Sequence, residues 1–338
     1  MPSLAALSQV TSAYRGGDYR ASLFQLANTF IPLTILYWAG VYWVFAAPLL
    51  CIPTAIVCGG LVVRAFNLQH DCSHRSFFRS KTANDLTGFL IGILTLTPHA
   101  CWRRFHNTHH ASNGNLEKRG YGDVKTLTVN EYLLLSPLQK LSYRFYRHPL
   151  TLFAFGAFAF FLIRQRLTYY IPREWKRERV SVHATNLGLL LAAWAVFAFT
   201  DNPWNVLTFH SGVMLVATGV GVWLYYIQHQ FPRAYWRLGG DWNSDEAALH
   251  GSSFCDLPRA MHWMTANIGY HHIHHVDVSI PNYRLPVCHA AQHKELEPRA
   301  RFTLLESFGY SRLKLWDENS ARMIGFSELP SRSAAATR

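Results

Sequence analysis

The sequence contains four histidine-rich stretches that decide its fold: His70-Asp71-Cys72-Ser73-His74, His106-Asn107-Thr108-His109-His110, Gln228-His229-Gln230 and His271-His272-Ile273-His274-His275. The first holds two histidines four residues apart, and the second and fourth each hold three at spacings of three and four. Residues at these spacings share one face of a helix. Each of these three stretches can therefore direct two or three imidazoles to one point. With His229 they supply nine, which is too many for one metal ion and suits two.

Long apolar segments lie directly before two of these stretches. Between Arg20 and Arg64 there is no charged residue, and Pro48 divides this region near its middle. A second uncharged pair of segments is divided by Asp201-Asn202-Pro203-Trp204, which is typical of a turn. Because about 20 apolar residues cross a bilayer core of about 30 Å, we expect four spans, at about 23–44, 49–66, 182–200 and 206–226. The shorter apolar stretches 86–96 and 150–163 are more typical of interfacial or buried helices.

The positions of the basic residues predict the orientation. The two short connectors contain no Lys or Arg, whereas the region between the hairpins contains many. Basic residues favour the cytoplasmic side. We therefore expect a cytoplasmic N-terminal segment (1–22), one membrane domain (23–329) with cytoplasmic regions 67–181 and 227–329, and a disordered tail (330–338). The predicted fold is an all-α integral membrane protein, in which two hairpins support a cytoplasmic helical cap that holds a di-metal site.

Composition excludes several other classes of protein. Only 15% of the residues are charged, against about a quarter in an average soluble domain, so the net charge of +12 indicates membrane topology rather than nucleic-acid binding. The six cysteines form no CxxC pair, which argues against a disulfide framework and a zinc site. Reduced thiols on a cytoplasmic face fit best.

The donor set narrows the choice of metal. Imidazole suits zinc, copper, iron and nickel, but the chain has neither the HExxH motif of zinc hydrolases nor the Glu-x-x-His motif of soluble di-iron bundles. A transmembrane haem would need paired histidines inside the spans, where only His210 is well placed. Two irons held by histidines alone remain the best fit.

These motifs resemble the membrane-bound histidine-box fatty-acid desaturases, especially the bacterial acyl-lipid branch that makes delta-12 (omega-6) double bonds. Flanking stretches strengthen the resemblance, which extends over about residues 69–285. They are Trp102-Arg103-Arg104, Gly114-Asn115-Leu116, Gly122-Asp123-Val124, Thr126-Leu127-Thr128, Asn267-Ile268-Gly269-Tyr270 and Ile280-Pro281-Asn282-Tyr283.

The resemblance implies an enzyme that uses two irons, O2 and an external electron donor to introduce a cis double bond into an acyl chain of a membrane lipid. It implies a ferredoxin-type donor and a bacterial inner-membrane location, with both termini and the histidines cytoplasmic. It implies nine iron ligands: His70, His74, His106, His109, His110, His229, His271, His274 and His275. His272 occupies a variable position and is left out.

Other residues are candidates for supporting these imidazoles. Neutral ligands leave the di-iron unit highly cationic, so nearby acceptors should orient the rings. Asp71, Asp123, Asp277 and Asn267 are the candidates, and a solvated acidic residue is an equally good interpretation of each aspartate. The chain departs from its relatives at two places: Pro232 stands where they carry Glu, and Tyr225 stands where acyl-CoA desaturases carry an Asn that supports a metal-bound water.

Three alternative functions stay open from the sequence. A lipid hydroxylase or carotenoid ketolase shares the histidine motifs and differs in product. A non-catalytic metal carrier would also be rich in histidine, but should place polar groups within its spans. A structural metal site is the least favoured, because such sites are four-coordinate and closed. The basic segment 140–179 is a candidate docking surface for an acidic donor, and contact with lipid headgroups explains it equally well.

Overall fold

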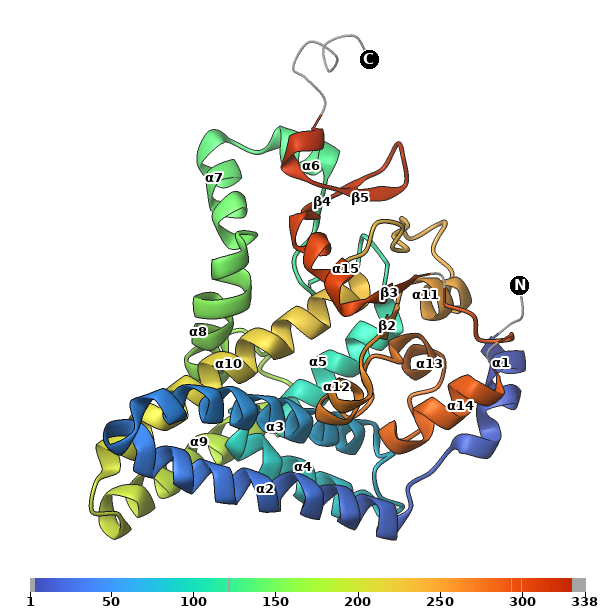
Figure 1. Ribbon diagram of the computed structural model, residues 1–338. Coiled ribbons are helices and arrows are strands. Elements are labelled where there is room, and N and C mark those ends of the chain that lie inside the picture. The colour runs from blue at the N-terminus through green and yellow to red at the C-terminus, as the bar shows by residue number, and fades with distance from the viewer. Residues whose placement is uncertain (1–3, 121, 293, 299, 330–338) are drawn as a thin grey trace.

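Two helical hairpins form the base of the protein. The computed structural model describes residues 4–120, 122–292, 294–298 and 300–329. The first hairpin pairs α2 (Tyr19–Ala46) with α3 (Pro48–His74), and the second pairs α9 (Lys176–Phe199) with α10 (Pro203–His229). All four are long and apolar enough to cross a membrane, in agreement with the expectation of four spanning helices. Figure 1 shows both hairpin turns at one end of the bundle, and at the other end the helices α12 (Arg259–Met264), α13 (His271–Val276) and α14 (Leu285–Ala291).

Each spanning helix is longer than its apolar segment. Hydropathy detects only the part of a helix that is apolar, whereas α3 and α10 continue as polar helix beyond it. As a result His70 and His74 belong to the last two turns of α3, and His229 is the last residue of α10. From the sequence, these histidines were expected just after the spans. In the structure they belong to the same continuous helices as the spans.

Local sequence explains where these helices begin and end. Pro48 and Pro203 are the first residues of α3 and α10, where a missing N–H costs nothing. The Asn202 side chain accepts a hydrogen bond from the Asn205 N–H and caps α10. Helix α3 stops at Arg75, which adopts a left-handed conformation with φ of 59°.

The region between the hairpins forms shorter helices. Helix α4 (Lys81–Leu94) packs on α3, and α5 (His99–Ser112) packs on α3, α4 and α9. Next come α6 (Val129–Leu134), α7 (Pro137–Tyr146), a π-helical turn η2 (Thr151–Phe155), α8 (Gly156–Leu162) and η3 (Arg164–Arg166). The segment from α7 through η3 is bent by 61° and counts as a fifth span only if the bent pair is taken as one.

The C-terminal region closes the cap with small elements. Strand β1 lies parallel to β4, which pairs antiparallel with β5, and β2 lies parallel to β3. The strands are β1 (Leu127–Thr128), β2 (Phe254–Asp256), β3 (Arg301–Thr303), β4 (Leu315–Asp317) and β5 (Arg322–Ile324). The helices are α11 (Ser244–His250), α12 (Arg259–Met264), α13 (His271–Val276), α14 (Leu285–Ala291) and α15 (Leu304–Gly309), with 3-10 turns at η4 (Asn282–Arg284), η5 (Tyr310–Arg312) and η6 (Phe326–Glu328).

The N-terminal segment is part of the cap. Helix α1 (Leu4–Thr11) and turn η1 (Ser12–Tyr14) precede α2, and the Leu7 side chain is buried in a cluster with Leu249, Ile273 and Ile280. This packing ties the start of the chain to α13. The predicted disordered tail, 330–338, lies outside the described residues.

Candidate metal centre

Four helices bring the predicted histidines together. The ends of α3 and α10 meet α5 and α13, and the ring nitrogens form two groups in which all ligand atoms lie within 4.8 Å of one another. The first group is His70, His74, His106, His110 and His274. The second is His109, His229 and His275.

His271 adjoins the second group. Its Nε2 lies 3.1 Å from Nε2 of His229 and 3.1 Å from Nε2 of His275. The two groups are neighbours, because the rings of His110 and His275 are 4.1 Å apart. The structure thus gathers all nine predicted histidines, five around one point and four around another.

The spacing of the nitrogens fits metal binding. Nε2 of His110 lies 3.0 Å from Nε2 of His106 and 3.1 Å from Nε2 of His274. Two imidazoles that bind one ion at right angles, with metal–nitrogen bonds of about 2.1 Å, place their nitrogens about 3 Å apart. Nε2 of His70 and of His74 is buried without a hydrogen-bond partner in the described part of the chain. Buried polar nitrogens of this kind need a partner, and a metal ion held by the first group would provide one for both.

Burial keeps the imidazoles of the cap neutral, which is the form that can bind a metal ion. Desolvation, and then repulsion between neighbouring imidazoles, holds the pKa of five of these histidines well below the usual value. They are His106, His110, His271, His274 and His275. A metal ligand must be a neutral imidazole, so this environment selects the protonation state that metal binding needs.

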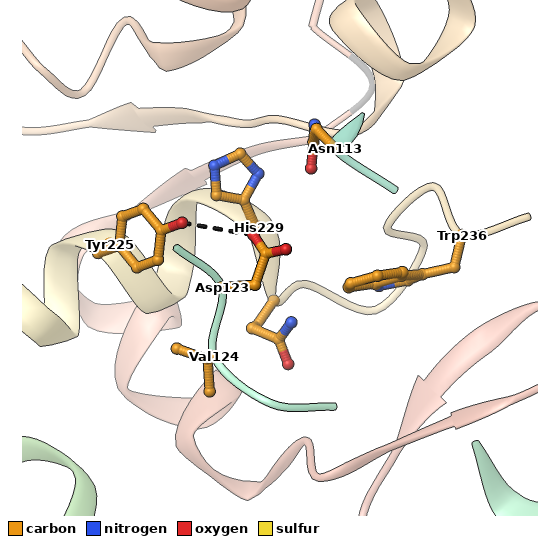
Figure 2. A pocket seen from close by; sticks show the side chains of 7 residues that line it. Asn113, Asp123, Val124, Tyr225, His229 and Trp236 are labelled. Atoms are coloured by element: carbon orange, nitrogen blue, oxygen red, sulfur yellow. Dashed lines mark hydrogen bonds between the residues drawn. The ribbon is translucent and has the colours of Figure 1, made fainter. Parts of the chain in front are cut away.

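Two acceptors outside the groups orient rings of the second group. Asp123 Oδ1 lies 2.5 Å from Nδ1 of His109, and the Gly251 carbonyl lies 2.8 Å from Nδ1 of His229. An acceptor at Nδ1 fixes the tautomer and leaves Nε2 free to bind a metal. Figure 2 shows Asp123 between Tyr225 and His229, where the Tyr225 hydroxyl donates to the same carboxylate oxygen. This small pocket offers about 10 Å³, which is room for about one water molecule.

The other three candidates lie further from the rings. Asp71 Oδ1 is 3.5 Å from Nδ1 of His70, and its Oδ2 accepts two hydrogen bonds from Asn282. Asp277 instead accepts hydrogen bonds from Thr11 and Arg15, so it fastens the N-terminal segment to the end of α13. Asn267 adopts φ of 59° and donates to the Asn282 carbonyl.

The remaining histidines that the sequence singled out stand apart from the two groups. His272 is buried and its ring faces those of Phe254 and His289. His210 on α10 contacts the ring of Tyr37 within the bundle. Neither belongs to a set of described residues whose ligand atoms converge.

Some residues of the site were not assigned a role from the sequence. The Trp102 indole stacks on the His106 ring at 4.4 Å, and Asn282 connects Asp71 to Gln25 of α2. The Pro232 carbonyl accepts a hydrogen bond from the Met323 N–H of β5. The stacking of Trp102 on His106 follows from their spacing of four residues on α5. The contacts of Asn282 and Pro232 have no such signal, because each joins segments far apart in the chain.

Comparison with known proteins agrees with this geometry. The family model described as fatty acid desaturase matches residues 46–306. A fatty acid desaturase of Bacillus subtilis is 37% identical over 328 residues, covering 95% of this chain and 90% of that protein. An sn-1 oleoyl-lipid 12-desaturase of Synechocystis is 27% identical, covering 72% and 69%, and a chloroplastic omega-6 fatty acid desaturase of Glycine max is 26% identical, covering 75% and 59%. The chain is a member of the fatty acid desaturase family and hence a membrane-bound oxidoreductase.

Proposed function

We propose that this protein is an O2-dependent di-iron desaturase that introduces a cis double bond, at the delta-12 or omega-6 position, into a monounsaturated acyl chain of a membrane lipid. The observation that carries this proposal is the convergence of nine imidazoles, seven of them buried, where the ends of α3 and α10 meet α5 and α13. The names of the relatives that act on oleoyl lipids or at the omega-6 position support the choice of substrate.

The two histidine groups would hold one iron each. His70, His74, His106, His110 and His274 would hold one, and His109, His229, His271 and His275 the other. When bound and reduced, such a pair supplies the O2 activation by which two hydrogens are removed from neighbouring methylenes of the acyl chain.

The protein's own residues would keep the site rigid, neutral and dry. Asp123 and the Gly251 carbonyl hold the rings of His109 and His229 in one tautomer. Trp102 stacks on His106 and limits its rotation. Seven of the nine histidines are buried, and exclusion of water from most of the site would limit side reactions there.

Electrons would come from a separate ferredoxin-type protein on the cytoplasmic side of a bacterial inner membrane. The basic segment 140–179 supports this docking only in part. Arg147 is fully buried and Arg179 donates to backbone carbonyls, whereas Arg144 and Arg173 are exposed. Exposed cations of this kind steer an acidic partner toward the surface.

Product analysis tests the proposal. The chain would be expressed in a host that makes only saturated and monounsaturated lipids, together with a ferredoxin system, and its fatty acid methyl esters profiled by gas chromatography and mass spectrometry. We expect a diene whose new double bond lies at delta-12 and which is absent with His109→Ala. A hydroxylated chain would identify a sibling oxygenase, and membrane-inserted protein that contains no iron would refute the di-iron site.

A further inference from the structure

A buried arginine lies at the border of the bilayer, away from the histidine groups. Arg64 of α3 is 2% exposed. Its guanidinium donates from Nε to the Thr29 hydroxyl (2.9 Å), from Nη2 to Asn28 Oδ1 (3.1 Å), and to the Trp263 carbonyl. It forms no ion pair with a carboxylate in the part of the chain that the structure describes. The cation is hydrogen-bonded but its charge is not neutralised.

The position of Arg64 along α3 gives its depth. It lies 16 residues after Pro48, the first residue of α3, so it is about 24 Å from the hairpin turn at 1.5 Å per residue. A hydrocarbon core is about 30 Å thick. With the hairpin turn at one edge of the core, Arg64 lies about 6 Å inside the other edge, on the side of the histidines and just beneath the phospholipid headgroups.

One polar residue near Arg64 faces lipid. The outer face of α2 carries Phe24, Ile31 and Ile35, which are 69%, 60% and 65% exposed. Asn28 lies on the same face, because positions 24, 28, 31 and 35 follow helical spacing. Its Oδ1 accepts from Arg64, and its amide nitrogen has no hydrogen-bond partner among the described residues. A free amide donor is costly next to hydrocarbon and suits an acceptor oxygen that comes from the lipid.

An exposed tryptophan covers the same arginine. The Trp263 ring lies 4.5 Å from the Arg64 guanidinium carbon and is 40% exposed. Tryptophan favours the headgroup level of a bilayer. Arg20 and Arg259 are also exposed, and they lie two turns before Asn28 on α2 and one turn before Trp263 on α12. The surface around Asn28 therefore combines an uncompensated positive charge, a free N–H donor and an interfacial aromatic.

We propose that Asn28, Arg64 and Trp263 form a binding site for the phosphate group of an anionic glycerophospholipid in the leaflet next to the histidine groups. The phosphate oxygens accept from the Asn28 amide and from Arg20 and Arg259, and the negative charge neutralises Arg64. The acyl chains lie along Ile31 and Ile35, which follow Asn28 toward the middle of the bilayer on the outer face of α2. Because α12 supplies Trp263, the bound lipid holds α12 against α2 and α3. This inference is independent of the proposed desaturase reaction.

Thermal unfolding of the purified full-length protein in detergent tests the site. A short-chain phosphatidylglycerol should raise the Tm, followed by circular dichroism, because a ligand that binds only the folded state stabilises it. Dioctanoylglycerol, which has no phosphate, and inorganic phosphate, which has no acyl chains, should leave the Tm unchanged. The measurement needs neither turnover nor bound iron, so its failure is distinct from failure of the proposed function.

Substitutions locate the effect. Asn28→Leu, at a partly buried position, and Arg64→Gln should each weaken phosphatidylglycerol binding at least ten-fold, whereas Arg312→Gln, at an exposed arginine of the cap, should not change it. A Tm shift that persists in Asn28→Leu and Arg64→Gln would overturn the proposal. So would an equal response to dioctanoylglycerol or to inorganic phosphate, since either would show that a whole phospholipid is not the ligand.

Discussion

Asp123 is the residue whose contact most directly affects a metal-binding ring. Its Oδ1 lies 2.5 Å from Nδ1 of His109. Replacing Asp123 by Asn keeps the volume but removes the negative charge, so the imidazole becomes a weaker ligand. Loss of such a partner costs about 10- to 100-fold in metal affinity or activity. We expect Asp123→Asn to lower turnover or iron content by this factor, measured by diene formation and iron analysis.

A matched substitution separates this effect from a general loss of acidic charge. Asp201 is exposed in the connector between α9 and α10, far along the chain from the histidines. Asp201→Asn should retain full turnover and iron content. If Asp123→Asn were as active as Asp201→Asn, the carboxylate would have no role beyond solvation.

His99 makes acid stability testable at a single residue. Its ring is buried against Gly88 of α4, and neither ring nitrogen has a hydrogen-bond partner in the described part of the chain. Burial lowers the pKa of His99 to about 4, from an ordinary histidine value of about 6.5. Below pH 6.5 the unfolded chain binds a proton that the folded chain excludes, so stability falls as pH drops from 6.5 to 4 and is unaffected above that window.

The expected loss is up to about 3 kcal/mol, because each unit of pKa shift corresponds to about 1.4 kcal/mol. His99→Leu removes the titrating group and keeps an apolar side chain of similar size. It should therefore unfold at lower pH than the wild type, with similar Tm at pH 7, as measured by circular dichroism. If His99→Leu unfolded at the same pH as the wild type, groups other than His99 would be responsible for the loss of stability in acid.

At the scale of elements, Arg147 joins three segments of the cap. Its fully buried guanidinium donates to the Lys125 and Leu313 carbonyls and to Gln230 Oε1, at 3.1, 3.0 and 3.0 Å. Gln230 directly follows His229, so Arg147 connects the end of α7 with the end of α10 and the C-terminal strands. Removing it leaves several buried acceptors without donors.

We expect Arg147→Gln to lower the stability of the cap by about 3 kcal/mol, since each buried unsatisfied group costs about 1–3 kcal/mol. Arg144→Gln is the matched control, because Arg144 lies one turn earlier on the same helix, is exposed and donates to the Tyr132 hydroxyl. Chemical denaturation followed by fluorescence would compare the two. Equal stability of both variants would show that the Arg147 network is replaceable by water.

The spanning helices and the histidine set could be predicted from the sequence because both depend on short-range patterns. A run without charge defines a span, and a spacing of three or four residues places His106, His109 and His110 on one helical face. The supports of the site could not be predicted. The acceptor for His229 is a backbone carbonyl, Gly251 O, which carries no residue-specific signal. Asn282 reaches Asp71 across 211 positions of sequence.

The aspartate candidates also show that sequence alone does not reveal which residue supports a metal-binding ring. Asp123 and Asp277 were equivalent in the sequence, as acidic residues close to histidine motifs. In the structure one contacts a ring of the second group and the other binds Thr11 and Arg15. Only the packing of α1 against α13, which depends on burial of Leu7, distinguishes them. Asn267 is likewise explained by its left-handed backbone, a conformation that asparagine tolerates better than most residues.

At the scale of the whole molecule, metal binding should stabilise the cap more than the bundle. The nine histidines come from α3, α5, α10 and α13, and without bound metal ring nitrogens such as Nε2 of His70 and of His74 are left without a partner, so these helices are held together poorly. A ligand that binds only the folded state adds stability in proportion to the logarithm of its concentration over Kd. Helices α2 and α9 supply no histidine to either group.

Removing metal with a chelator should therefore increase amide hydrogen exchange in α5 and α13, while exchange in α2 and α9 stays the same, as measured by mass spectrometry. Restoring ferrous iron should reverse the change, and uniform exchange across all six helices would mean that the metal centre stabilises the fold as one unit.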